Sequence, residues 1–298
     1  MKIKLSDSLT MSNIVHGFWR LHQWNLTDSE LLNLIEKCID IGITTVDHAD
    51  IYGHYTCEKK FGDAIALNPS IRNNLQIVTK CGIKFPCENN EYKYHIYDTS
   101  SNHIISSVEN SLNNLHTDYI DLLLIHRPDP LMDPSDVAEA FDKLKSQGKV
   151  LNFGVSNFLP SQFNLLNSYL NVPLVTNEIE LSVLNLENLN NGTVDLAQEK
   201  GIHPMIWSPL AGGKIFTDNS SKASNIRKVL EKIRYEIGAN SIDEIAYAWL
   251  LHHPSKMIPI VGSHKIERLK SAVNATNIKL TKEQWFQIYT ASLGHDID

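Results

Sequence analysis

Acidic, basic and aromatic side chains directly follow short apolar runs at several places along this chain. In the stretch Thr44 to Tyr52, TTVDHADIY, a β-branched run ends in two aspartates, a histidine and a tyrosine. Such a run is typical of a strand, and a solvent-facing loop after it would more usually carry Gly, Pro or Ser. We therefore expect a strand that ends in an active site, with Asp47 and Tyr52 among its chemical groups.

Further apolar runs end in polar side chains in the same way. They lie at 75–79, 120–125, 150–155 and 174–176, and the residues that follow them are Lys80, His126, Ser156 with Asn157, and Asn177 with Glu178. A lone residue of any of these types more often has a structural role, such as capping a turn or bonding a backbone carbonyl. The repetition at successive strand ends favours chemistry.

Helical patterns alternate with apolar runs along the chain. The expected barrel strands lie at 12–17, 43–46, 75–79, 120–125, 150–155, 174–176, 203–207 and 258–261, with a small edge strand at 2–5 before them. The expected helices lie at 29–41, 57–67, 102–115, 134–147, 160–170, 193–200, 226–237, 241–251, 265–273 and 282–289. This alternation predicts a (β/α)8 TIM barrel, as a single domain over residues 1–298. An open doubly wound parallel sheet is the alternative.

The two folds would place the polar strand ends differently. In a barrel, every strand has its carboxyl end at the same mouth, so the predicted groups would form a ring. In an open sheet they would spread along a row. The loop at 82–101 is long for a strand-to-helix connection, and loops of that length are usually functional or disordered. Its aromatic residues suggest a substrate wall made of Phe85, Tyr92, Tyr94 and Tyr97.

Composition excludes several classes of function. The chain has 298 residues, 42% of them apolar, and a formal net charge of −7, which argues against a nucleic-acid surface. No apolar stretch approaches 18 residues, and the N-terminus has no secretory pattern, so we expect no membrane association and a cytoplasmic location. The four cysteines should stay thiols. The histidines show no familiar zinc-ligand spacing, so we expect no metal.

An ordered set of short motifs resembles the aldo-keto reductase superfamily, and the match covers nearly the whole chain. The motifs are Asp47 with Tyr52 five residues later, Lys80 in IVTKCGI, His126 in DLLLIHRPDP, and Ser156 with Asn157 in GKVLNFGVSNF. The resemblance implies a reductase that transfers hydride from NADPH to a small aldehyde or ketone. It also implies that Tyr52 is the proton donor.

The catalytic set is chemically consistent with that role. A tyrosine has an ordinary pKa of about 10, so donating a proton near neutrality is helped by a cation that stabilises the phenolate. Lys80 would be that cation and would lower the pKa of Tyr52. Asp47 would pair with Lys80 and hold it in place, while His126 would orient the carbonyl or share the proton.

The resemblance also implies a cofactor site on the barrel itself, since no GxGxxG motif follows a strand. Ser156, Asn157 and Glu178 would hold the nicotinamide carboxamide, and Trp207 would stack on the ring. The residues expected along the pyrophosphate are Ser208, Leu210, Gly212 and Lys214. Further cofactor contacts are expected from Gly17, Phe18, Trp19, Asp47, Gly262 and Ser263.

A basic helix start follows the last strand, in IPIVGSHKIERLKSA. A helix N-terminus with adjacent cations forms an anion site, and in this family that position receives the 2′-phosphate. Lys265 and Arg268 would bind it, which favours NADP over NAD. Many relatives have an asparagine near Ser271 and Ala272, so the adenine contacts should differ here.

Two other functions stay open from the sequence. Lys80 could form a Schiff base with a carbonyl substrate, as in a lyase, although Tyr52 and His126 would then have no role. Some members of the superfamily bind the cofactor and act mainly as regulatory subunits on a membrane channel, with little turnover.

Overall fold

Eight short parallel strands close into a barrel in the computed structural model, which describes residues 2–297. They are β3 (Val15–Gly17), β4 (Thr45–Asp47), β5 (Gln76–Cys81), β8 (Leu122–Ile125), β9 (Phe153–Ser156), β10 (Leu174–Glu180), β11 (Met205–Trp207) and β12 (Ile258–Val261). The last strand pairs with the first, Ile260 beside Val15. The closed ring confirms the predicted barrel and excludes the open sheet.

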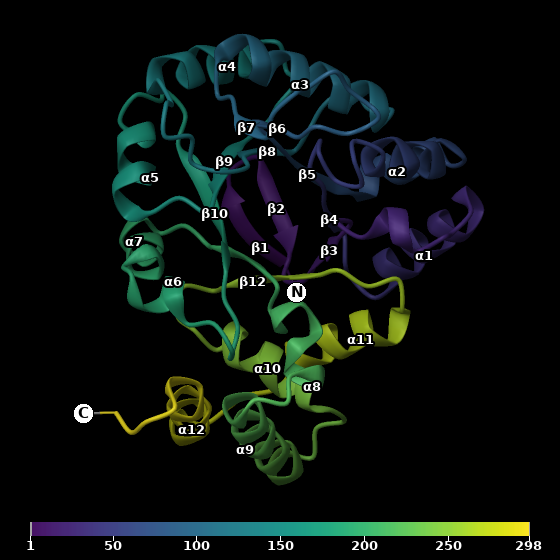
Figure 1. Cartoon of the computed structure of the whole chain (residues 1–298). Helices are drawn as coiled ribbons and strands as arrows, with labels where there is room; N and C mark the ends of the chain where they lie inside the picture. The colour runs from purple at the N-terminus through teal and green to yellow at the C-terminus, as the bar shows by residue number, and fades with distance from the viewer. Residues whose placement is uncertain (1, 298) are drawn as a thin grey trace.

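Helices form an outer ring around these strands (Figure 1). Between successive strands lie α1 (Asp28–Asp40), α2 (Cys57–Ala66), α3 (Ser101–Asn114), α4 (Pro134–Ser146), α5 (Pro160–Asn167), α6 (Glu187–Asn190), α7 (Thr193–Lys200), α8 (Lys214–Thr217), α9 (Ser221–Ile237) and α10 (Ile242–Leu251). After β12 come α11 (Ile266–Ala275) and α12 (Lys282–Leu293). Each predicted helix is present, and most have ends shifted by a few residues.

The helix ends follow local signals in the sequence. Thr27 begins α1 with a capping box: its hydroxyl accepts from the Glu30 N–H, and the Glu30 carboxylate accepts from the Thr27 N–H. Gly201 ends α7 in a left-handed conformation with φ of 66°, which costs glycine no side-chain clash. The first cap marks the start of α1, and the second ends α7 shortly before β11 begins at Met205.

An N-terminal hairpin closes one end of the barrel. Of the barrel strand predicted over 12–17, residues 15–17 form β3, whereas Leu9–Ser12 forms β2, which pairs antiparallel with β1 (Lys2–Ser6), the predicted edge strand. Leu9 and Met11 are buried among side chains of the barrel interior, and the Ser12 N–H donates to the Thr45 hydroxyl at the start of β4. Figure 1 shows β1 and β2 across the middle of the ring. The hairpin therefore plugs the amino-terminal end.

The last helix is attached by two tryptophans. The indole rings of Trp249 on α10 and Trp285 on α12 stack with centroids 5.2 Å apart. Each indole N–H donates to the other residue's backbone carbonyl, at 3.3 and 3.0 Å. Buried indoles usually need such a partner. The pair anchors α12, which follows the eighth strand-helix unit, to the barrel wall.

Candidate active site

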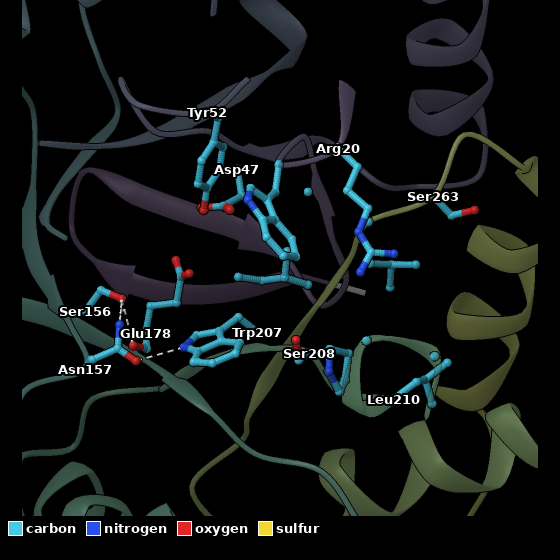
Figure 2. Close-up of a pocket in the computed structure, with 18 of the residues that line it drawn as sticks. Arg20, Asp47, Tyr52, Ser156, Asn157, Glu178, Trp207, Ser208, Leu210 and Ser263 are labelled. Carbon is cyan, nitrogen blue, oxygen red and sulfur yellow. Dashed lines mark hydrogen bonds between the residues drawn. The ribbon is translucent and has the colours of Figure 1, made fainter. Parts of the chain in front are cut away.

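A cavity of about 1020 Å³ opens where the barrel strands end. Most of the residues predicted from the sequence line it, namely Gly17, Trp19, Asp47, Tyr52, His126, Ser156, Asn157, Glu178, Trp207, Ser208, Leu210, Gly212, Gly262, Ser263 and Arg268. They come from strands far apart in the chain, and the closed barrel brings them to one mouth, as the sequence predicted. Figure 2 shows ten of the lining residues labelled.

Four predicted residues do not line the cavity. Lys80 is buried beneath it but reaches its lining through hydrogen bonds. Phe18 packs in the core with the His48 ring, whose centroid lies 4.7 Å away. Lys214 and Lys265 are exposed outside the lining. Their roles toward a cofactor stay predictions.

Lys80 is the centre of the ionisable groups. Its Nζ lies 2.6 Å from Asp47 Oδ1 and 3.1 Å from the Tyr52 hydroxyl, and it donates to the His48 carbonyl at 3.0 Å. Glu178 Oε2 lies 3.2 Å from the same nitrogen. β4, β5 and β10 each contribute one of the charged groups, so the barrel register fixes their separations. A tyrosine, a lysine and two carboxylic acids thus form one cluster.

Burial sets the electrostatics of this cluster. Burial disfavours the charge on Lys80, but Asp47 and Glu178 outweigh it and hold the lysine pKa above its ordinary value. Burial, together with the neighbouring Asp47, raises the pKa of Glu178 to about 8. Burial also raises the pKa of Asp47, against the attraction of Lys80. Lys80 is therefore charged, while its two acidic partners compete to ionise.

The expected lowering of the Tyr52 pKa is wrong for the cofactor-free protein. Burial raises the pKa of Tyr52, and the Lys80 ammonium lowers it by less than burial raises it. The sequence identified Lys80 and its partner Asp47, but not that Asp47 and Glu178 both lie close enough to oppose the phenolate charge. Tyr52 is therefore a neutral phenol with its proton in place, bonded to a lysine that can stabilise the anion when it forms.

His126 supplies a neutral polar group beside this cluster. It follows β8, and its ring faces Tyr52 edge to face with centroids 5.8 Å apart. Burial and the nearby Lys80 lower the pKa of His126 well below its ordinary value. Within residues 2–297 its Nδ1 has no hydrogen-bond partner. A neutral imidazole can donate one hydrogen bond, and so can orient a carbonyl oxygen.

On the opposite wall of the cavity, hydrogen bonds hold three side chains in a fixed orientation. The Asn157 amide donates to the Ser156 hydroxyl at 2.8 Å, and the Trp207 indole N–H donates to the Asn157 carbonyl oxygen at 2.9 Å (Figure 2). Asn157 has a left-handed backbone with φ of 62°. Such strain in a residue other than glycine is typical of functional sites. The predicted carboxamide contacts thus lie side by side, with Trp207 beside them.

The loop after β11, residues 208–213, has a strained backbone and lines one part of the cavity, which we call the trough. Ser208 and Ala211 have φ of 51°, and Gly212 has φ of 66°. Arg20 lines the same part of the cavity, and its side chain points toward this loop in Figure 2. Sequence reasoning missed Arg20, although it is the cation in the aromatic stretch GFWRLHQW. Exposed backbone groups beside a guanidinium suit an anionic group.

The far end of the cavity carries Arg268 together with an acid. Asp243 and Tyr247 of α10 line this end, and the Ser271 hydroxyl donates to Asp243. The sequence suggested no role for Asp243. A long segment separates β11 from α10, so nothing in the sequence indicated that this helix borders the trough. Since Lys265 does not line the cavity, Arg268 is the better placed of the two predicted phosphate ligands.

The outer mouth is partly aromatic. Tyr97 lines it as predicted, together with Trp19, which is 57% exposed, and with His95 and Arg127. Phe85, Tyr92 and Tyr94 do not line it, because the 82–101 loop folds back as a short hairpin of β6 (Ile83–Lys84) and β7 (Ile96–Tyr97). The predicted wall is therefore much smaller than expected.

Between residues 2 and 297, no group of three or more His, Cys, Asp or Glu side chains is arranged to hold a metal ion. In the same range, no helix combines the length and apolar character needed to cross a bilayer.

Proteins similar to this chain are named as aldo/keto reductases or other oxidoreductases. The family model described as Aldo/keto reductase family matches residues 13–292. The "Uncharacterized oxidoreductase YcsN" of Bacillus subtilis (strain 168) is 58% identical over 297 residues, covering 99% of each chain. The "6-dehydroglucose reductase" of Agrobacterium fabrum is 42% identical, again covering 99% of each. A crystal structure of the thermostable aldo-keto reductase Tm1743 with the inhibitor epalrestat is similar at a TM-score of 0.82 and 26% identity, covering 98% of this chain and 99% of that one.

Proposed function

The chain belongs to the aldo/keto reductase family of oxidoreductases, and we propose that it reduces a small aldehyde or ketone with NADPH, using Tyr52 as the proton donor. The observation that carries this proposal is the Lys80 ammonium, which bonds both Asp47 and the Tyr52 hydroxyl at the floor of the cavity. A phenol that gains negative charge as it gives up its proton is stabilised by this adjacent cation.

The cavity residues fit a nicotinamide cofactor, which would supply the hydride. Ser156 and Asn157 present a fixed hydroxyl and amide for the carboxamide, and Trp207 offers a flat apolar face for the ring. His126 and the Tyr52 hydroxyl converge where the substrate oxygen would lie. As charge develops on that oxygen, Tyr52 transfers its proton and Lys80 stabilises the phenolate left behind.

A preference for NADPH is supported by the cations along the trough. Arg20 lies beside the strained loop and Arg268 lies at the far end of the cavity. Asp243, also at that end, would bond a ribose hydroxyl but repel a phosphate. We propose that Arg268 outweighs Asp243, because a guanidinium bonds phosphate with charge-assisted hydrogen bonds.

A polar carbonyl substrate fits the outer mouth. His95, Tyr97 and Arg127 line it, so several hydrogen-bond donors face the substrate side. A relative at 42% identity is named a 6-dehydroglucose reductase. We propose a polyhydroxylated or similarly polar aldehyde rather than an alkyl aldehyde.

The charge of Lys80 disfavours the lyase alternative. A Schiff base requires a neutral amine, yet Asp47 and Glu178 hold the pKa of Lys80 above its ordinary value despite burial. Borohydride should therefore fail to trap a carbonyl substrate on the protein, and trapping at Lys80 would support the lyase. For a regulatory subunit, 4-nitrobenzaldehyde would not be turned over.

The decisive first experiment is a fluorescence titration with NADPH followed by a carbonyl panel. We expect NADPH binding, consumption of NADPH with aldehydes, and higher kcat/KM for polar aldehydes than for alkyl aldehydes of equal size. Binding without turnover on any carbonyl would favour the regulatory role. A lack of NADPH binding would contradict the proposal.

A further inference from the structure

Two buried carboxyl groups face a single ammonium at the base of the cavity. Lys80 is 0% exposed, Asp47 3% and Glu178 2%. Asp47 accepts a hydrogen bond from Lys80, whereas Glu178 Oε2 lies 3.2 Å from Nζ and has no hydrogen-bond partner within residues 2–297. Figure 2 shows the Glu178 carboxyl pointing toward Asp47 and Tyr52. One cation cannot compensate two buried negative charges.

Among residues 2–297, Lys80 is the only cation that forms a salt bridge with Asp47 or Glu178. Asp47 faces Glu178 from β4, Lys80 from β5, and Tyr52 from the loop after β4. His126, after β8, is neutral because burial and Lys80 lower its pKa. Arg127 lies with its guanidinium carbon 5.8 Å from the Trp207 ring, at the outer mouth. The cluster is close to neutral only when its two acids hold one proton.

We propose that Glu178 is a proton reserve: it shares one proton with Asp47, and after hydride transfer this proton passes through Lys80 to reload the Tyr52 phenolate. The proposal rests on the proposed function of Tyr52 as donor. The transfer balances, since Lys80 gives one proton to the phenolate oxygen and takes one from the Glu178 carboxyl. Its own charge is unchanged at the end.

The geometry provides the whole path. The Tyr52 hydroxyl lies 3.1 Å from Lys80 Nζ, and Glu178 Oε2 lies 3.2 Å from the same atom. The resulting Glu178 carboxylate would lie near the oxidised nicotinamide, whose positive charge replaces that of the lost proton. Burial and Asp47, which raise the pKa of Glu178 to about 8, are what keep the proton on the pair near neutrality.

A first test needs no cofactor. Infrared difference spectra of the free protein, recorded across a pH titration, report the carbonyl stretch of protonated carboxylic acids. We expect a band that disappears as pH rises through about 8 and is missing in Glu178→Gln. Glu58→Gln is the matched control, since Glu58 is another buried acid with its pKa raised by burial to about 7. Glu178→Gln spectra that retain every titrating band would overturn the proposal.

A second test measures the ratio of the NADP⁺ and NADPH dissociation constants between about pH 6.5 and 8.5. Taking the ratio cancels the titration of the phosphate that both ligands carry. Below the pKa of Glu178, the binding of NADP⁺ must release the proton shared by Glu178 and Asp47. The dissociation constant of NADP⁺ divided by that of NADPH should therefore fall with rising pH, by up to about tenfold per pH unit. It should be independent of pH in Glu178→Gln. A flat ratio in the wild type would contradict the reserve. If neither cofactor form bound, the proposed function would fail, and the infrared test would still decide the reserve.

Discussion

Glu178 Oε2 lies 3.2 Å from Lys80 Nζ, so the acid expected at the nicotinamide is also a partner of the lysine that bonds Tyr52, the proposed proton donor. The cofactor wall and the proton-transfer group are therefore connected through one side chain. A change at Glu178 should affect both the binding of the oxidised ring and the acid-base chemistry of Tyr52.

Replacing Glu178 with Gln should tighten NADPH binding relative to NADP⁺ binding. With NADP⁺ bound, an ionised Glu178 can only accept hydrogen bonds and its charge favours the cationic ring, whereas Gln is neutral and both donates and accepts. We expect a shift of about 1 kcal/mol in the difference between the two binding free energies. Fluorescence titration with both cofactor forms measures it, and an unchanged difference would show that Glu178 does not act on the ring.

Replacing Arg268 with Ala should weaken NADPH binding and leave NADH binding nearly unchanged. The loss should be about 2 kcal/mol, the scale of hydrogen bonds to a charged group. Lys265→Ala is the matched control, because Lys265 is an exposed cation outside the cavity and should matter less. Equal losses for NADPH and NADH in Arg268→Ala would place the 2′-phosphate elsewhere.

The pair of Arg72 and Asp121 should be important for stability. The Arg72 guanidinium donates to Asp121 at 2.8 Å, and Asp121 also accepts from the Ile77 N–H at the start of β5. Both residues are buried, so Asp121→Ala leaves an uncompensated charge and should cost about 3 to 5 kcal/mol in urea denaturation. Asp63→Ala, at an exposed pair with Lys59, should cost under about 1 kcal/mol. Similar losses of unfolding free energy in both variants would refute the structural role of the buried pair.

Glu58 should make stability depend on pH. Burial raises its pKa from 4.5 to about 7, so between these values the folded state binds a proton that the unfolded state has lost. This contribution to stability therefore falls as pH rises from about 4.5 to 7. The free energy of unfolding of Glu58→Gln should not fall in this way. The difference in unfolding free energy between the variant and the wild type should therefore be up to about 3 kcal/mol more favourable to the variant at pH 8 than at pH 4.5. Parallel stability curves for the two proteins would contradict a buried, protonated Glu58.

The barrel could be predicted because its strands and the helices between them carry local sequence signals. The capping box at Thr27 and the apolar run ending in Lys80 are signals within a few residues. Of the N-terminal hairpin, only the first strand was predicted, over 2–5, since Leu9–Ser12 was not recognised as a strand and Ser12 was assigned to the barrel strand over 12–17. Nothing local distinguishes a strand that plugs a barrel from one that belongs to it.

Within the site, residue identity was predictable but the balance of charges was not. Asp47, Lys80 and Tyr52 meet as expected, but Glu178 was expected at the cofactor rather than also at Lys80. Its place depends on which strands are neighbours across the barrel interior, a property of closure rather than of sequence spacing. The raised pKa of Tyr52 follows from the same burial.

The most direct measurement of the central claim is the rate of NADPH oxidation by an aldehyde in Tyr52→Phe. The variant removes only the hydroxyl that bonds Lys80, so NADPH should bind with unchanged affinity. Turnover should fall by at least about 100-fold, the contribution expected of a general acid. Reduction of the aldehyde at a rate near that of the wild type, with NADPH bound equally well, would contradict Tyr52 as the proton donor.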